Sequence, residues 1–185
     1  IEKTIKVKAR GVAVTVEVTP HHLYFDETML GESRTEFQVN PPIRQSKENR
    51  LALIKFLKDG HIDYLATDHA PHSKEEKQKG ISGLTHLDTY GSVATWLMAE
   101  HGFSPADIAR VCAQNPAKFL NEFISNKYGE IKEGGVGSLT ILNPNKSIKI
   151  TAEVLKTKCG WSPFLGMTFP GSVTATIIKG KIYEK

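Results

Sequence analysis

In the first half of the chain, apolar residues form short continuous runs in some segments and recur every three to four residues in others. A nearly continuous β-branched run predicts a strand over Val12–Val18, and a second apolar run predicts a strand over Ile62–Ala66. Between them, an apolar helical face predicts a helix over Lys47–Asp59, with Ser46 as its N-cap. Strand, helix and strand in this order favour a parallel pair in an α/β fold.

The rest of the chain divides into a helical part and a glycine-punctuated β part. Further helices are expected at Ile1–Ala9, Leu87–His101, Ser104–Ala113 and Asn115–Phe123. Short strands are expected at Ser138–Leu142, Thr174–Ile178 and Lys181–Tyr183, the last two as a hairpin. Two long loops are expected, one over residues 19–46 with an extended piece at Glu36–Val39 and one over residues 67–87. We therefore expect an α/β body over residues 1–128 and a mainly β unit over residues 129–185.

Composition and charge exclude several classes of protein. The 185 residues carry a formal net charge of only +4, and no basic stripe with interleaved aromatics supports nucleic-acid binding. Lysines alternate with acids, as in Lys74-Glu75-Glu76-Lys77, so we expect that stretch to be a solvated surface. No apolar run has membrane length. The widely separated Cys112 and Cys159 suit a reducing compartment, so the expected location is cytoplasmic.

Polar side chains follow both predicted strands at the point where each strand ends. Thr19-Pro20-His21-His22 follows the first, and Thr67-Asp68-His69-Ala70-Pro71-His72 follows the second. In barrel and α/β enzymes the chemistry sits at these carboxyl ends, and imidazole and carboxylate both bind zinc. The two ends therefore predict two walls of one metal site, which only one of His21 and His22 can face if the segment is extended. The alternatives are surface histidines and an ordinary Asp–Pro turn.

Asp68 is the candidate for proton transfer. A carboxylate beside a divalent metal stays ionised and can exchange a proton with water. His72 would bind substrate. A third segment, Asn40-Pro41-Pro42-Ile43-Arg44, would present an amide and a guanidinium to an anionic ligand, or would be a stiff polyproline turn with a surface arginine. His86 has no clear partner in the sequence.

These segments, in this order, resemble the C-terminal half of the dihydroorotase family of amidohydrolases. The segments that carry the resemblance are Val16–Leu23, Asn40–Arg44, Ala66–His72 and Trp161–Phe164 with the Gly-Lys-Ile-Tyr hairpin beyond, so it covers essentially the whole chain. The resemblance implies the C-terminal part of a metal-dependent (β/α)₈ TIM barrel with an appended small β-sandwich-like unit. It also implies the reversible cyclisation of N-carbamoyl-L-aspartate to L-dihydroorotate in pyrimidine biosynthesis.

Position by position, the resemblance implies that His22 and Asp68 bind zinc and that Asp68 is also the general acid and base. The residues that it places at the substrate are Asn40, His72, Arg44 and Gly80. One or two Zn²⁺ ions would be bound, with the remaining ligands on earlier strands that this sequence lacks. The segment Gly83–Leu87 departs from the Gly-Leu-Glu-Thr sequence expected there.

A full barrel needs about 250 residues, so we expect this chain to be incomplete and to work with an N-terminal half. The expected partners are the small-molecule substrate, that missing half and further copies in a homo-oligomer, with no nucleic acid and no membrane. The alternative functions are another cyclic amidohydrolase, such as an allantoinase, and a non-catalytic dihydroorotase-like scaffold subunit.

Overall fold

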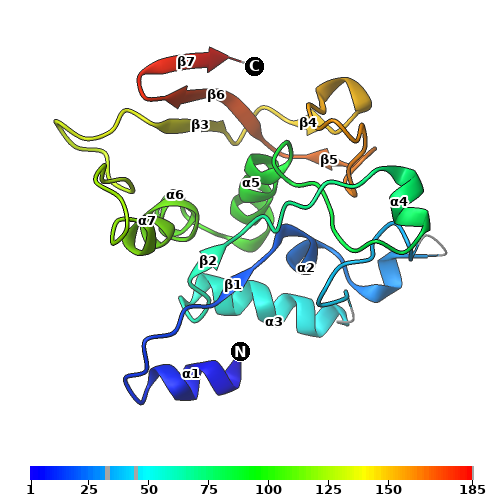
Figure 1. The fold of residues 1–185 in the computed structure, drawn as a ribbon, viewed down its shortest axis with the longest axis horizontal. Helices are drawn as coiled ribbons and strands as arrows, with labels where there is room; N and C mark the ends of the chain where they lie inside the picture. Colours follow the sequence, from blue (N-terminus) through cyan, green and yellow to red (C-terminus); the bar gives the residue numbers. More distant parts are fainter. Residues whose placement is uncertain (32–33, 44–45, 185) are drawn as a thin grey trace.

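The protein is described from a computed structural model that covers residues 1–31, 34–43 and 46–184 (Figure 1). The helices are α1 Glu2–Lys8, α2 Pro20–Tyr24, α3 Lys47–Lys58, α4 Lys74–Gln78, α5 Tyr90–His101, α6 Pro105–Ala109 and α7 Asn115–Leu120. The strands are β1 Glu17–Val18, β2 Tyr64–Leu65, β3 Leu139–Asn143, β4 Ile148–Lys149, β5 Thr168–Phe169, β6 Ser172–Ile178 and β7 Lys181–Glu184. Short 3₁₀ turns lie at Glu27–Met29 and Ala152–Val154.

The strands β1 and β2 form the parallel pair that the strand–helix–strand order predicts. Val18 pairs with Leu65, and α3 connects the two strands. The predicted first strand was too long, however, because only Glu17–Val18 is strand and residues 12–15 are exposed. A β-branched run becomes a strand only where a neighbour pairs with its backbone groups, and no described segment pairs with residues 12–15.

Local sequence signals explain most of the helices. The Ser46 side chain accepts a hydrogen bond from Asn49 N at 3.5 Å and caps α3, as predicted. The two helices expected after Ser104 form one continuous helical segment, in which a π-helical turn at Arg110–Gln114 joins α6 to α7. Within the described residues, no helix combines the length and the apolar character needed to cross a membrane.

Two predictions for the loops were wrong. Residues 34–37 form a turn instead of the extended piece expected over Glu36–Val39. The loop expected over residues 67–87 contains a short helix, α4, whose N-terminus is a capping box between Ser73 and Glu76. Ser73 N donates to Glu76 Oε2 at 2.8 Å, and Glu76 N donates to Ser73 Oγ at 3.2 Å. The Ser-x-x-Glu spacing was therefore a readable helix start.

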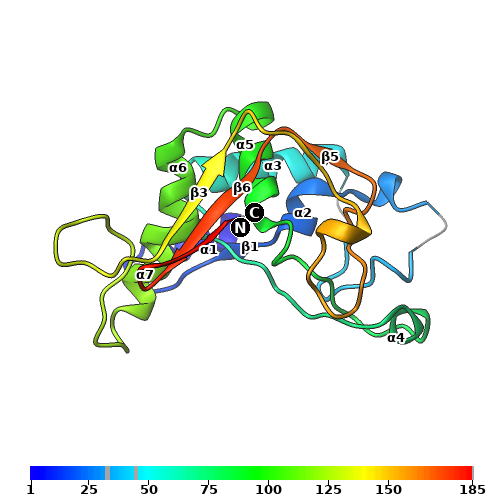
Figure 2. The ribbon, with the colours of Figure 1, turned by 90° about the horizontal axis from the view of Figure 1, so that it is seen from above.

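The C-terminal strands form a three-stranded antiparallel sheet in the order β3-β6-β7, and β4 pairs with β5 (Figures 1 and 2). The predicted hairpin is confirmed: Ile178 pairs with Lys181, and Lys179 and Gly180 both have positive φ angles between the two strands. This region shares a hydrophobic core with the body, since Phe164 packs in the same buried cluster as Leu65 and Leu97. The division at residues 128 and 129 stays a prediction.

Candidate functional site

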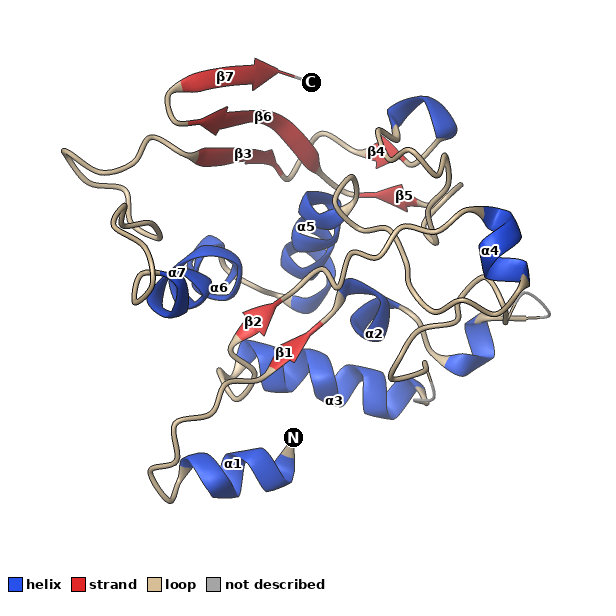
Figure 3. Ribbon diagram, viewed as in Figure 1, coloured by secondary structure: helices blue, strands red, loops and turns tan. Residues whose placement is uncertain are grey.

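The strands β1 and β2 lie side by side (Figure 3), and each is followed by a candidate metal ligand. His22 follows β1 within α2, and Asp68 follows β2. The extended conformation assumed for His21 and His22 was wrong, because Thr19 caps a helix that begins at Pro20. Threonine at the N-cap and proline at the first helical position are the sequence signals that predict this start.

Both ring nitrogens of His22 have close neighbours. Nδ1 lies 2.7 Å from Thr19 Oγ1, and Nε2 lies 3.0 Å from the carbonyl oxygen of Pro41. Burial lowers the pKa of His22, while the Pro41 carbonyl and the negative charge of Asp68 act in the opposite direction. The negative charge of Asp68, just after β2, thus acts on the ring of His22, just after β1.

Asp68 is exposed and has a left-handed backbone, with φ of 46°. Non-glycine residues in this region are strained, and such residues cluster at functional sites. The next residues are anchored to the chain beyond α4: His69 Nδ1 accepts from His86 N at 3.0 Å, and Ala70 N donates to Leu84 O at 2.9 Å. These bonds anchor the segment directly after Asp68, whose side chain is exposed to solvent.

His21 and His86 form a buried pair that the sequence analysis missed. Their rings are stacked with centroids 4.9 Å apart, and His21 Nδ1 lies 2.8 Å from His86 Nε2. Burial is the main cause that lowers the pKa of His21 to about 2 and that of His86 to about 3. In the described part of the chain, His21 Nε2 and His86 Nδ1 have no hydrogen-bond partner. The charge of Asp68 acts on the pKa of His22 and is not among the causes that shift the pKa of His21.

The segment around Asn40 lies against His22. Asn40 is exposed and precedes a cis peptide bond to Pro41, whose carbonyl contacts the His22 ring. This contact brings the amide of the third predicted segment to the same end of the β1–β2 pair. Arg44, the other candidate in that segment, lies outside the described residues.

His72 and Gly80 flank α4. The His72 ring packs against Gly83, where an added Cβ would lie 2.9 Å from His72 Cδ2. The backbone oxygen of His72 accepts a hydrogen bond from Trp161 Nε1 at 2.8 Å, so a residue noted only for the family resemblance positions a candidate. Gly80 has a φ of +82°, and an added Cβ would lie 3.4 Å from the Gln38 side chain.

Comparison with known proteins decides the family. Residues 2–183 match the amidohydrolase family. The chain belongs to the amidohydrolase family. It is 38% identical over 182 residues to a dihydroorotase of Clostridium botulinum (strain Eklund 17B / Type B), covering 98% of this chain and 43% of that protein. It is 36% identical over 180 residues to a dihydroorotase of Mycobacterium tuberculosis, covering 95% of this chain and 41% of that protein.

Solved structures support the same fold for this amidohydrolase. An L-hydantoinase from Arthrobacter aurescens superimposes with a TM-score of 0.85 at 26% identity, over 100% of this chain and 42% of that chain. A D-hydantoinase from Thermus sp. has a TM-score of 0.83 at 22% identity, over 100% of this chain and 42% of that chain. The expected amidohydrolase fold is thus confirmed. The chain spans less than half the length of the relatives that it matches.

The described residues of this amidohydrolase do not form a complete metal site. A zinc site needs at least three protein ligands, and in the described ranges no group of three histidine, cysteine, aspartate or glutamate residues could hold a metal ion. His22 and Asp68 have suitable donor atoms. Both ring nitrogens of His22 are engaged in this conformation, Nδ1 with the Thr19 hydroxyl and Nε2 with the Pro41 carbonyl, so zinc would replace one of these two contacts. The donor set therefore fits zinc in kind and is incomplete in number.

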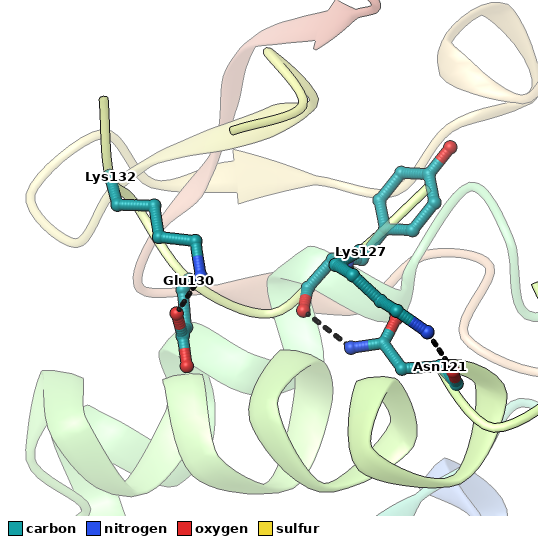
Figure 4. A pocket seen from close by; sticks show the side chains of 5 residues that line it. Asn121, Lys127, Glu130 and Lys132 are labelled. Carbon is teal, nitrogen blue, oxygen red and sulfur yellow. Dashed lines mark hydrogen bonds and ion pairs between the residues drawn. The ribbon is translucent and has the colours of Figure 1, made fainter. Parts of the chain in front are cut away.

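A small pocket of about 180 Å³ lies elsewhere, between α7 and β3 (Figure 4). It is lined by Asn121, Lys127, Tyr128, Glu130 and Lys132. Its polar groups already pair with one another: Asn121 Nδ2 donates to Tyr128 O at 3.1 Å, and Lys132 Nζ lies 2.7 Å from Glu130 Oε2. None of the predicted site residues lines it, and these contacts already engage its polar groups.

Proposed function

We propose that this chain is the C-terminal part of a dihydroorotase, which catalyses the reversible, zinc-dependent cyclisation of N-carbamoyl-L-aspartate to L-dihydroorotate. The observation that carries the proposal is the placement of His22 and Asp68 just after the paired strands β1 and β2, where the charge of Asp68 acts on the pKa of His22. The identity of 36–38% to dihydroorotases over nearly the whole chain supports the substrate class. Cytoplasmic location stays a prediction.

Asp68 is assigned the proton transfers. In the direction of hydrolysis, the oxygen of a water molecule bonds to the ring carbonyl carbon, and the carboxylate of Asp68 accepts the proton that the water loses. Asp68 then donates this proton to the ring nitrogen as the carbon–nitrogen bond breaks. Ring closure is the reverse sequence. Zinc, when bound, polarises the carbonyl group and lowers the pKa of water. The exposed position of Asp68 leaves its carboxylate accessible to substrate.

The remaining candidates are assigned to the substrate. The amide of Asn40 and the ring of His72 would donate hydrogen bonds to it, and the backbone around Gly80 would contact its ring. Arg44 would bind a substrate carboxylate, for which a guanidinium is well suited. The two loops that carry Asn40 and Gly80 are connected, because Gly83 N donates to Gln38 O at 3.0 Å. That connection supports a single binding surface.

We further propose that this chain forms the last strands and helices of a (β/α)₈ barrel together with a small β-sandwich-like unit. The incomplete ligand set supports this view. So do the apolar residues left exposed on the C-terminal sheet, such as Ile141 at 48% and Ile182 at 60%. A preceding segment would supply the other metal ligands and cover this surface. Assembly into a homo-oligomer stays a prediction.

The test is dihydroorotate hydrolysis by the protein that carries this chain together with the preceding segment. Asp68→Asn should lower the rate by about 10²- to 10⁴-fold, because it removes the proton-transfer group. The matched control is Asp59→Asn, which alters an exposed carboxylate paired with Lys55 on α3 and should retain the wild-type rate within about twofold.

Three outcomes would count against the proposal. An Asp68→Asn rate above about a tenth of wild type would remove Asp68 from the mechanism. Turnover of allantoin without dihydroorotate would favour another cyclic amidohydrolase, and turnover of neither would favour a scaffold. The 185 residues by themselves should be inactive and gain activity on co-expression with the preceding segment. Full activity and stoichiometric zinc in the isolated chain would overturn the half-barrel assignment.

A further inference from the structure

Lys77 is buried in a stretch that the sequence analysis assigned to a solvated surface. Its exposed fraction is 1%, so the expectation for Lys74–Lys77 was wrong at this residue. Its ammonium group donates to three backbone oxygens: Gln38 O at 2.7 Å, Ile81 O at 2.9 Å and Gly83 O at 2.9 Å. An ammonium group has three N–H donors, so these bonds use its full capacity.

The three acceptors belong to the two loops that carry the candidate substrate contacts. Gln38 lies just before Asn40, and the other two acceptors lie just after Gly80. Gln38 O also accepts from Gly83 N at 3.0 Å. Gly83 in turn packs against the ring of His72. The ammonium group of Lys77 therefore joins both loops.

Moving the charged ammonium group of Lys77 out of water costs free energy, which other interactions must offset. Among the described residues Lys77 has no carboxylate partner, and burial lowers its pKa. A buried ammonium without a counter-ion is unfavourable unless its donors are all satisfied. The charge also lies near the strand ends, because it contributes, after burial and the neighbouring histidines, to the lowered pKa of His21. An exposed lysine would serve solubility equally well, so the burial points to a requirement for this loop arrangement.

We propose that Lys77 is a positioning residue that holds the loops 38–41 and 79–83 in the conformation that receives the substrate. The inference rests on the proposed function, because it takes these loops to bind the substrate. Lys77 acts through the backbone and does not touch the reacting atoms. Loss of the ammonium should therefore weaken substrate binding in the ground state and the transition state alike, which raises KM and leaves kcat nearly unchanged.

The experiment compares Lys77→Met with Lys74→Met in the active protein. Methionine keeps most of the length of the side chain and removes its donors, while Lys74 is an exposed lysine at the start of α4, outside both loops. Lys77→Met should raise KM by about tenfold or more and change kcat by less than about threefold. Lys74→Met should leave both unchanged. A lower kcat with an unchanged KM would show only a smaller folded fraction and would overturn the inference.

Amide hydrogen exchange provides a second, independent readout. In Lys77→Met the amide of Gly83 should exchange faster, because its acceptor Gln38 O is no longer held, while the amides of α3 and α5 should keep their wild-type rates. Faster exchange everywhere, or no change at Gly83, would overturn the inference. Should Lys77→Met fail to fold, Lys77→Gln replaces it, since that variant keeps two N–H donors.

The two proposals fail in different ways. A wild-type protein that turns over no dihydroorotate would refute the proposed function, and the exchange at Gly83 would then decide by itself whether Lys77 holds the loops. An active wild type with an unchanged KM in Lys77→Met would refute the role of Lys77 and leave the proposed function intact.

Discussion

A decrease in pH from about 7.5 to about 5 should weaken the fold through the buried pair of His21 and His86. Both rings are fully buried, and burial lowers their pKa to about 2 and about 3. In the unfolded chain a histidine titrates near 6.5, so at lower pH the unfolded state binds protons that the folded state does not. The free energy of unfolding is therefore highest above pH 6.5 and falls as the pH drops toward the folded pKa values.

The loss of folding stability can be calculated from the difference in histidine pKa between the folded and unfolded states. At about pH 5 each histidine that stays neutral in the folded state costs about 2 kcal/mol relative to neutral pH, so the pair costs about 4 kcal/mol. That is a large share of the roughly 5–15 kcal/mol typical of a folded protein. Burial also lowers the pKa of His22 and of His101, which adds to the loss in the same direction. Hydrogen bonds lower the pKa of Asp26, Asp59 and Asp107, so these carboxylates contribute little in this window.

Urea unfolding at the two pH values measures the loss, with the buried Trp96 and Trp161 as fluorescence probes. His86→Phe keeps an aromatic ring in the buried position and removes one titrating group, so the pH-dependent loss should fall by about half. His61→Gln, outside the pair, should retain the full loss.

The comparison is made within each variant, so a change in absolute stability does not affect it. A His86→Phe protein with the same pH dependence as wild type would refute the reasoning. So would a midpoint near pH 6.5 for the ring resonances of His21 or His86 in the folded protein, followed by NMR.

Two further predictions concern the site. His22→Ala should lower the zinc bound per folded molecule of the full-length enzyme far more than His21→Ala does, because His21 is committed to a buried pair; equal losses by elemental analysis would overturn the assignment. Gly83→Ala should destabilise the protein by about 2–4 kcal/mol in urea unfolding, since its φ is +135° and its Cβ would lie 2.7 Å from Ala70 O. Gly134→Ala, with a φ of +73° and no atom within 4 Å of its Cβ, is the matched control and should lose about 1–2 kcal/mol; equal losses in the two variants would contradict the clash.

Much of the candidate site could be predicted from local sequence. Continuous apolar runs ending in His22 and Asp68, with a helix between them, were enough to place both residues at the ends of a parallel pair. The capping signal at Ser46 and the hairpin turn at Gly180 were also local, because each depends on the hydrogen bonds and backbone angles of a few neighbouring residues.

Two short helices were missed although the sequence carries the capping signals that start them. The helical conformation of His21 and His22 was readable from Thr19 and Pro20, and the helix α4 was readable from Ser73. In both cases neighbouring features, an apolar strand before the first and a charged loop around the second, suggested another conformation.

The sequence by itself determined the order of the longer helices and of the strands β1, β2, β3, β6 and β7, the family and the residues that follow β1 and β2, because these depend on neighbours along the chain. Only the tertiary structure decided that Lys77 is buried and that His86 meets His21. The partners of these side chains are carbonyl oxygens and a ring that lie far away in the sequence, and no local pattern encodes such a meeting. It also decided that residues 12–15 form no strand, since a strand requires a neighbour to satisfy its backbone hydrogen bonds.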